Sequence, residues 1–283
     1  MKYTSLVSLA LLAQACGPSV AGNPDAAGTD AAADATRLPD TGPQPDTRPP
    51  PDNTAVYAHS ATELYRIDPE TLIQSLVGEF TFEGTAKHIT DIAVDKNGAM
   101  IGISLDTVYA IDRATAAATW LSTYDSGGSG MTSLSFVPTD LDDPDSDERL
   151  VAADFDGVVW EIDAATGEMT AIGNYNESGS DIGSSGDIVA IYDFGIVATV
   201  NVEGEEDDYL ARIDPATWRA EVIGDTGYDD IFGLGFWGGH IYGFTDNKEF
   251  VTIDPDTGQV VQMSLGTIEW WGAGVTTIAP IID

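Results

Sequence analysis

Cysteine and basic residues are scarce in this 283-residue chain. It has a single cysteine, Cys16, so no disulfide can form within the chain. Lysine and arginine together number 11 against 47 aspartates and glutamates, which gives a formal net charge of −36. Such a charge repels phosphate backbones, and we therefore expect no nucleic-acid partner. The hydrophobic fraction of 43% is nevertheless enough to build a folded core.

Residues that carry nucleophilic or metal catalysis are also few. The three histidines, His59, His88 and His240, stand far apart and form no pair with metal-ligand spacing. No G-x-S-x-G turn is present, and no cysteine follows Cys16. Paired carboxylates can act as a general acid and base, but nothing in the sequence selects one pair among so many acids. From the sequence, enzyme activity is uncertain, and a protein without enzyme activity is favoured.

The first fifteen residues have the pattern of an export signal. Lys2 precedes an apolar run over residues 6–13, which is too short to span a bilayer as a mature helix. The segment that follows, Ala13-Gln14-Ala15-Cys16, resembles the lipobox of bacterial lipoproteins. The resemblance implies lipidation of Cys16 and attachment to the outer membrane, on its periplasmic side or at the cell surface. Ordinary signal cleavage beside an incidental cysteine is the alternative.

A Pro-, Ala- and Asp-rich segment follows, over residues 17–53. It holds eight of the fourteen prolines and has no apolar face to bury, so we expect a disordered tether. The predicted organisation is a signal peptide (1–15), a lipidated cysteine with its tether (16–53) and a folded domain (54–283).

An internal repeat predicts the fold of that domain. Five segments share a pattern of an apolar residue, Ile-Asp and then Thr: LYRIDPETL, VYAIDRATA, VWEIDAATG, LARIDPATW and FVTIDPDTG. Their aspartates are Asp68, Asp112, Asp163, Asp214 and Asp254, and the spacing of 40 to 51 residues fits a four-stranded propeller blade. We interpret each aspartate as a turn residue that accepts backbone N–H bonds, because a catalytic group would not recur in every blade.

The frame around the repeats predicts five blades. Short alternating strands separated by Gly, Asp and Asn turns surround each copy, and no stretch has helical periodicity. The first copy lacks an inner strand, and residues 272–280 supply one at the C-terminus. We therefore expect an all-β, five-bladed β-propeller closed by pairing of the C-terminal strand with the N-terminal blade. The repeat is similar to that of secreted IDPxTG propellers, allied to quinoprotein-like and YVTN-type propellers, a group in which binding proteins, scaffolds and a few enzymes occur.

The loops between consecutive blades carry the candidate ligand-binding residues. They enter the innermost strands and should ring one mouth of the channel, a usual position for ligands. Aromatic rings beside carboxylates can bind a sugar or a cationic group, and packing between blades is the alternative for the rings. The candidates are Tyr124, Asp125, Asp181, Tyr228, Asp229, Asp230, Glu269, Trp270 and Trp271.

An acidic turn over residues 140–148 is a candidate metal site. Asp143, Asp145 and Asp147 alternate as oxygen ligands of Ca²⁺ do, although Glu148 stands where an EF-hand loop needs glycine. The hypothesis is a Ca²⁺ ion that orders the turn, and a solvated acidic loop is the alternative.

Two functions remain open. The first is a monomeric, envelope-anchored binding or scaffold module for an unknown envelope protein or glycan. The second is a hydrolase that acts on a glycan or lactone at the channel mouth.

Overall fold

The computed structural model describes residues 55–85, 87–176 and 181–282, and every regular element in these ranges is a β-strand. This confirms the expected near absence of helix for the described part of the chain. Within it there is no helix long and apolar enough to cross a membrane. The predicted export signal, Cys16 and the tether lie outside the described residues.

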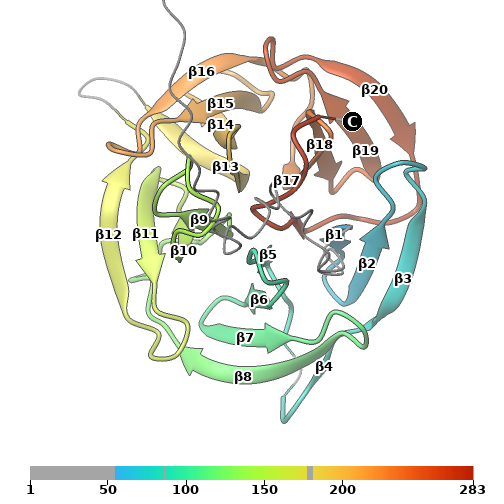
Figure 1. Cartoon of the computed structure of the whole chain (residues 1–283), viewed down its shortest axis with the longest axis vertical. Coiled ribbons are helices and arrows are strands. Elements are labelled where there is room, and N and C mark those ends of the chain that lie inside the picture. Colours follow the sequence, from blue (N-terminus) through green and yellow to red (C-terminus); the bar gives the residue numbers. More distant parts are fainter. Residues whose placement is uncertain (1–54, 86, 177–180, 283) are drawn as a thin grey trace, which may run out of the picture. The chain divides into compact units, whose positions relative to one another are not determined.

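The strands form five antiparallel sheets that are arranged as the blades of a ring (Figure 1). Blade 1 takes strands from both ends of the described chain, in the order β21 (Gly272–Gly274), β1 (Val56–His59), β2 (Glu63–Ile67) and β3 (Gln74–Glu79). In blades 2 and 3 the strands follow chain order from the inside of the ring outward. Blade 2 consists of β5 (Asp91–Val94), β6 (Met100–Ile103), β7 (Thr107–Ile111) and β8 (Ala117–Thr123). Blade 3 consists of β9 (Ser135–Pro138), β10 (Glu148–Ala153), β11 (Val158–Ile162) and β12 (Met169–Asn174).

Blades 4 and 5 repeat the same plan. Their strands are β13 (Ile182–Ile191), β14 (Gly195–Val202), β15 (Tyr209–Ile213) and β16 (Ala220–Asp225), then β17 (Ile231–Trp237), β18 (His240–Thr245), β19 (Glu249–Ile253) and β20 (Val260–Leu265). One strand was not expected: β4 (Thr81–Phe82) runs parallel to β8 at the outer edge of blade 2.

The ring closes as the sequence predicted, although by a shorter strand. Strand β21 pairs with β1 at three positions, including Ala58 with Ala273. The predicted strand over 272–280 stops at Gly274 because the chain then turns toward blade 2. There Thr276 bridges Val94, and its hydroxyl donates to the carbonyl of Asp95 at 3.0 Å. The five-bladed propeller closed by its C-terminal strand is confirmed.

The repeated aspartate makes the same turn in all five blades. In blade 4, for example, Oδ1 of Asp214 accepts the N–H groups of Ala216 and Thr217 at 2.9 and 2.8 Å. The hydroxyl of Thr217, which donates to the same oxygen at 2.9 Å, and these N–H bonds hold the pKa of Asp214 below its ordinary value. The predicted turn role is confirmed by equivalent bonds at Asp68, Asp112, Asp163 and Asp254.

The residue after each repeat threonine adopts a left-handed conformation. Glycine satisfies this requirement at Gly167 and Gly258, with φ of 76° and 75°. The same conformation occurs at Leu72, Ala116 and Trp218, with φ between 57° and 63°, so the turn geometry overrides the local steric preference there.

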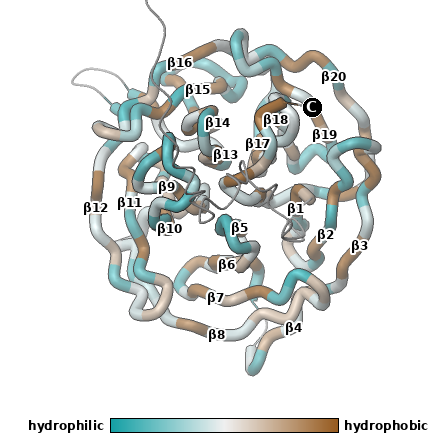
Figure 2. Tube along the Cα trace, viewed as in Figure 1, coloured by the Kyte–Doolittle hydropathy of each residue, from teal (hydrophilic) through white to brown (hydrophobic). Residues whose placement is uncertain are grey.

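The hydrophobic core lies between neighbouring blades. One cluster joins Tyr57 and Leu64 of blade 1 to Ile92 and Tyr109 of blade 2, and three further clusters join the other blades. Figure 2 shows hydrophobic residues recurring in every blade. The packing between sheets therefore fixes the positions of the loops at both mouths of the ring.

Candidate functional site at the loop mouth and on the axis

Two inter-blade loops and the turn between β18 and β19 meet above blade 5 and gather five carboxylates, which we call the acidic patch: Asp229, Asp230, Asp246, Glu249 and Glu269. Burial raises the pKa of Asp246, and the charges of the other four members raise it further. Burial and the neighbouring Asp229 likewise raise the pKa of Asp230. Burial is thus the larger cause of both raised pKa values, and repulsion between neighbouring carboxylates adds to it.

Few groups within the described structure neutralise the patch. Nζ of Lys248 lies 3.2 Å from Oε1 of Glu269, and the amide of Asn247 donates to Asp229 at 3.4 Å. The sequence had pointed to Asp229, Asp230 and Glu269, whereas Asp246 and Glu249 were missed because they come from the turn between β18 and β19.

The aromatic candidates separate into exposed and packed rings. Trp271 is 37% exposed, and its indole lies 5.8 Å from the His88 imidazole between ring centroids. Trp270 is buried and packs edge-on against Tyr65 and Phe244. Tyr228 is half-buried against the core of blades 4 and 5. Only Trp271 of these three presents a substantial ring surface at the mouth.

The remaining candidates lie away from the acidic patch. Tyr124 is buried, and its hydroxyl donates to the carbonyl of Ser104 at 2.5 Å, so its ring packs between blades 2 and 3. Asp125 is exposed and accepts the N–H of Gly127 at 2.9 Å. Asp181 is exposed, and its carbonyl accepts the N–H of Glu203. Asp125 thus stabilises the turn of its own loop, and neither acid joins the patch.

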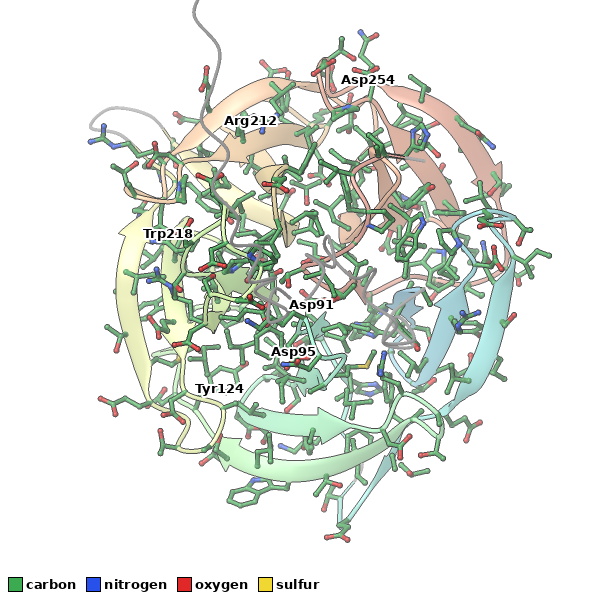
Figure 3. The ribbon with its side chains drawn as sticks, in the orientation of Figure 1. Asp91, Asp95, Tyr124, Arg212, Trp218 and Asp254 are labelled. Atoms are coloured by element: carbon green, nitrogen blue, oxygen red, sulfur yellow. The ribbon has the colours of Figure 1, made fainter. Side chains whose placement is uncertain are left out.

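A second group of acids, which the sequence did not single out, lies on the axis of the ring. Asp91 of β5 and Asp187 of β13 are both buried, and their carboxyls lie close enough to share a hydrogen bond (Figure 3 labels Asp91 near the centre). Two carboxyls can form such a bond only when one of them carries a proton. Burial raises the pKa of both groups, and the charge of Asp187 raises the pKa of Asp91 further.

Backbone N–H groups from successive inner strands surround this axial pair. Asp187 accepts the N–H of Ile188 on Oδ1 and that of Leu234 on Oδ2, both at 2.7 Å. Oδ1 of Asp91 accepts the N–H of Ile92 at 2.8 Å. The backbone N–H of Leu134 lies near both carboxyls and lowers the pKa of each. The pair thus links blades 2, 3, 4 and 5 at the axis.

His59 stands beside the axial pair. Its Nδ1 pairs with the carbonyl of Ser60 at 2.8 Å, and its Nε2 has no hydrogen-bond partner among the described residues. Burial lowers its pKa to about 4, so the ring is neutral at physiological pH. A Cβ at Gly272 would lie 2.4 Å from Oδ1 of Asp91 and 2.5 Å from Nε2 of His59, so the closing strand needs glycine here.

The acidic turn proposed for Ca²⁺ is folded against the opposite mouth. Nζ of Lys96 donates to the carbonyl of Ser146 at 2.6 Å, and the Thr277 hydroxyl donates to Glu148. Asp143, Asp145 and Asp147 are exposed. The N–H of Asp145 donates to Oδ1 of Asp143 at 3.0 Å. Among the described residues, no group of three or more His, Cys, Asp or Glu side chains is placed to hold a metal ion. Calcium binding stays a prediction.

Comparisons with known proteins add little to this picture. No protein-family model and no curated protein matches the chain. Solved structures similar to it include the calcium-binding protein regucalcin from Agrobacterium tumefaciens (14% identity, 80% of this chain and 76% of that chain, TM-score 0.45). Another is the Dos1 propeller, with 13% identity over 76% of this chain and 56% of that chain and a TM-score of 0.41. A third is BamB from Moraxella catarrhalis, with 16% identity over 77% of this chain and 62% of that chain and a TM-score of 0.34. This chain thus covers less than two thirds of the length of the Dos1 propeller and of BamB. Similarities this distant carry no argument about function.

Proposed function

We propose that this protein is an exported, lipid-anchored binding module that presents the loop mouth of its propeller to a partner in the cell envelope. The export pattern, Cys16 and the Pro-rich segment support the anchoring, because together they resemble the leader and tether of bacterial lipoproteins. The five-bladed ring supports the binding role, because packed sheets hold the mouth loops on a rigid base.

The acidic patch carries this proposal. Burial raises the pKa values of Asp230 and Asp246, and repulsion by neighbouring members of the patch raises them further. A cationic group placed among them relieves that repulsion, and the exposed ring of Trp271, two residues after Glu269 in the chain, offers a face for a cation–π contact. The partner chemistry that fits is a lysine- or arginine-rich segment of an envelope protein, drawn in by the net charge of −36.

The test uses a defined probe rather than a cell extract. A decalysine peptide is titrated into the propeller at low and high salt, and binding is followed by calorimetry. The Asp229→Asn/Glu269→Gln variant should bind several-fold more weakly than the wild type. The control variant Asp256→Asn/Glu168→Gln removes the same charge from exposed turns elsewhere and should bind as the wild type does. Equal weakening in both variants would indicate attraction to overall charge and would contradict a site at the mouth.

A hydrolase acting on a glycan or lactone is the second candidate. One observation favours it: the raised pKa values of Asp230 and Asp246 are what a general acid needs near neutral pH. The axial pair is unsuitable for this chemistry, because Asp91 and Asp187 are fully buried and out of reach of a substrate. Turnover of a chromogenic glycoside or lactone that disappears in Asp230→Asn and Asp246→Asn would establish the hydrolase, whereas no turnover by the wild type would exclude it for the substrates tested.

A further inference from the structure

A cavity of about 580 Å³ opens at the seam where blade 5 meets blade 1, on the rim opposite the loop mouth. Its walls come from the repeat turn of blade 1, from strands β17 to β20 of blade 5 and from the C-terminal segment. This volume lies within the range of small-molecule sites, roughly 300–1,000 Å³. None of the candidate residues from the sequence lines it.

The cavity combines aromatic surface with planar polar groups. Trp237 is half-buried in its wall, and Tyr242 is buried beside it. The polar side chains of Glu70, His240 and Gln262 are exposed at the rim. A carboxylate, an imidazole and an amide each present hydrogen-bonding atoms in a plane, which suits neighbouring hydroxyl groups.

The walls are tied to the ring, so the cavity exists without a ligand. The hydroxyl of Tyr242 donates to the carbonyl of Pro69 at 3.4 Å, which joins blade 5 to the blade 1 turn. The N–H of Gly238 donates to the carbonyl of Pro280 at 2.8 Å, which fixes the C-terminal segment next to Trp237. A preformed cavity loses little conformational entropy when it binds.

We propose that this seam cavity binds a neutral saccharide. A pyranose ring has an apolar face that stacks on an indole and hydroxyl groups along its edge that pair with planar polar side chains. The net charge of −36 disfavours an anionic ligand. Among the described residues that line the cavity, Glu70 is the only carboxylate, so the acid cluster that distinguishes the loop mouth does not occur in this lining.

The experiment is a calorimetric titration of the propeller with three neutral oligosaccharides, chitotetraose, maltotetraose and mannotetraose, up to concentrations well above about 1 mM. At least one should bind. Glu70→Ala/Gln262→Ala should weaken that binding tenfold or more, since both side chains are exposed and their removal leaves the core intact. The matched control Glu168→Ala/Gln259→Ala removes the same residue types from exposed positions and should bind as the wild type does.

A second variant and a second ligand separate the possible outcomes. Trp237→Ala should also abolish saccharide binding, and thermal unfolding of that variant shows whether the fold survives. Decalysine binding at the loop mouth should be unchanged in Glu70→Ala/Gln262→Ala, so failure of the mouth proposal and failure of this one are distinguishable. No binding of any of the three oligosaccharides, or binding that the Glu70 and Gln262 changes leave intact, would overturn the proposal.

Discussion

Two Asp→Asn substitutions at neighbouring positions on the axis should have different effects on stability. Oδ1 of Asp91 accepts one backbone N–H, and its Oδ2 has no donor besides the shared proton. In Asp91→Asn the new amide group can donate to Asp187 where that proton did, while the N–H of Ile92 keeps its acceptor. We therefore expect Asp91→Asn to be at least as stable as the wild type at neutral pH.

Asp187→Asn should instead be destabilising. Both carboxylate oxygens of Asp187 accept backbone N–H bonds, from Ile188 and Leu234. An amide at this position turns one acceptor into a donor and leaves a buried N–H without a partner, which costs about 1–3 kcal/mol. At roughly 2–4 °C per kcal/mol for a domain of this size, the melting temperature should fall by about 2–12 °C.

The shared proton also predicts how the stability of the fold changes with pH. Because the pKa of Asp91 is raised, the folded protein keeps a proton that the unfolded chain releases above about pH 4. The stabilisation is therefore present at acidic pH and is lost as the pH rises toward the raised pKa. Between about pH 5 and pH 8 the wild type should lose more stability than Asp91→Asn does.

Chemical denaturation of the three proteins at both pH values measures these differences. Comparison with the wild type cancels the contribution of the acidic surface, which is common to all three. Equal destabilisation by Asp91→Asn and Asp187→Asn, or the same pH dependence in wild type and Asp91→Asn, would refute the shared proton.

Three further predictions concern the anchor, the acidic turn and the ring closure. If Cys16 is lipidated, Cys16→Ala should move the protein from the membrane to the soluble fraction, and a variant that stays membrane-bound would contradict the anchor. If Ca²⁺ orders the turn at 140–148, millimolar Ca²⁺ should raise the melting temperature of the wild type but not that of a triple Asn variant at Asp143, Asp145 and Asp147, whereas an equal rise in both would indicate screening. A chain that ends at Gly266 loses the buried Trp270 and Val275 and should melt far below the wild type, while deletion of 17–53 should leave the melting temperature unchanged.

The repeat made the architecture predictable because every blade needs the same local solution. Five Ile-Asp segments predicted five turns, and the hydrogen bonds of Asp68 and its equivalents occur in each. The closing strand was predictable because the first blade lacked an inner member. Its length was not, since the pairing of Thr276 with Val94 brings together residues 182 positions apart.

The site was only partly predictable, because burial in a loop depends on the neighbouring blades. Trp270 and Trp271 are adjacent in the sequence, yet one packs against Phe244 and the other is exposed at the mouth. Asp91 and Asp187 each precede an isoleucine in an apolar inner strand, and that repeated Asp-Ile step was the available signal. Nothing local indicates that the two carboxyls meet on the axis.

The closed ring is the central structural claim, because the loop mouth, the axial pair and the seam cavity all depend on it. Hydrogen exchange measured by mass spectrometry tests it directly on the native protein. The amides of β1 and β21 that pair Ala58 with Ala273 should be protected to the same degree as those of β18 in the centre of blade 5. Exchange of the 272–276 segment within seconds, while β18 stays protected, would show that the C-terminal strand does not close the ring.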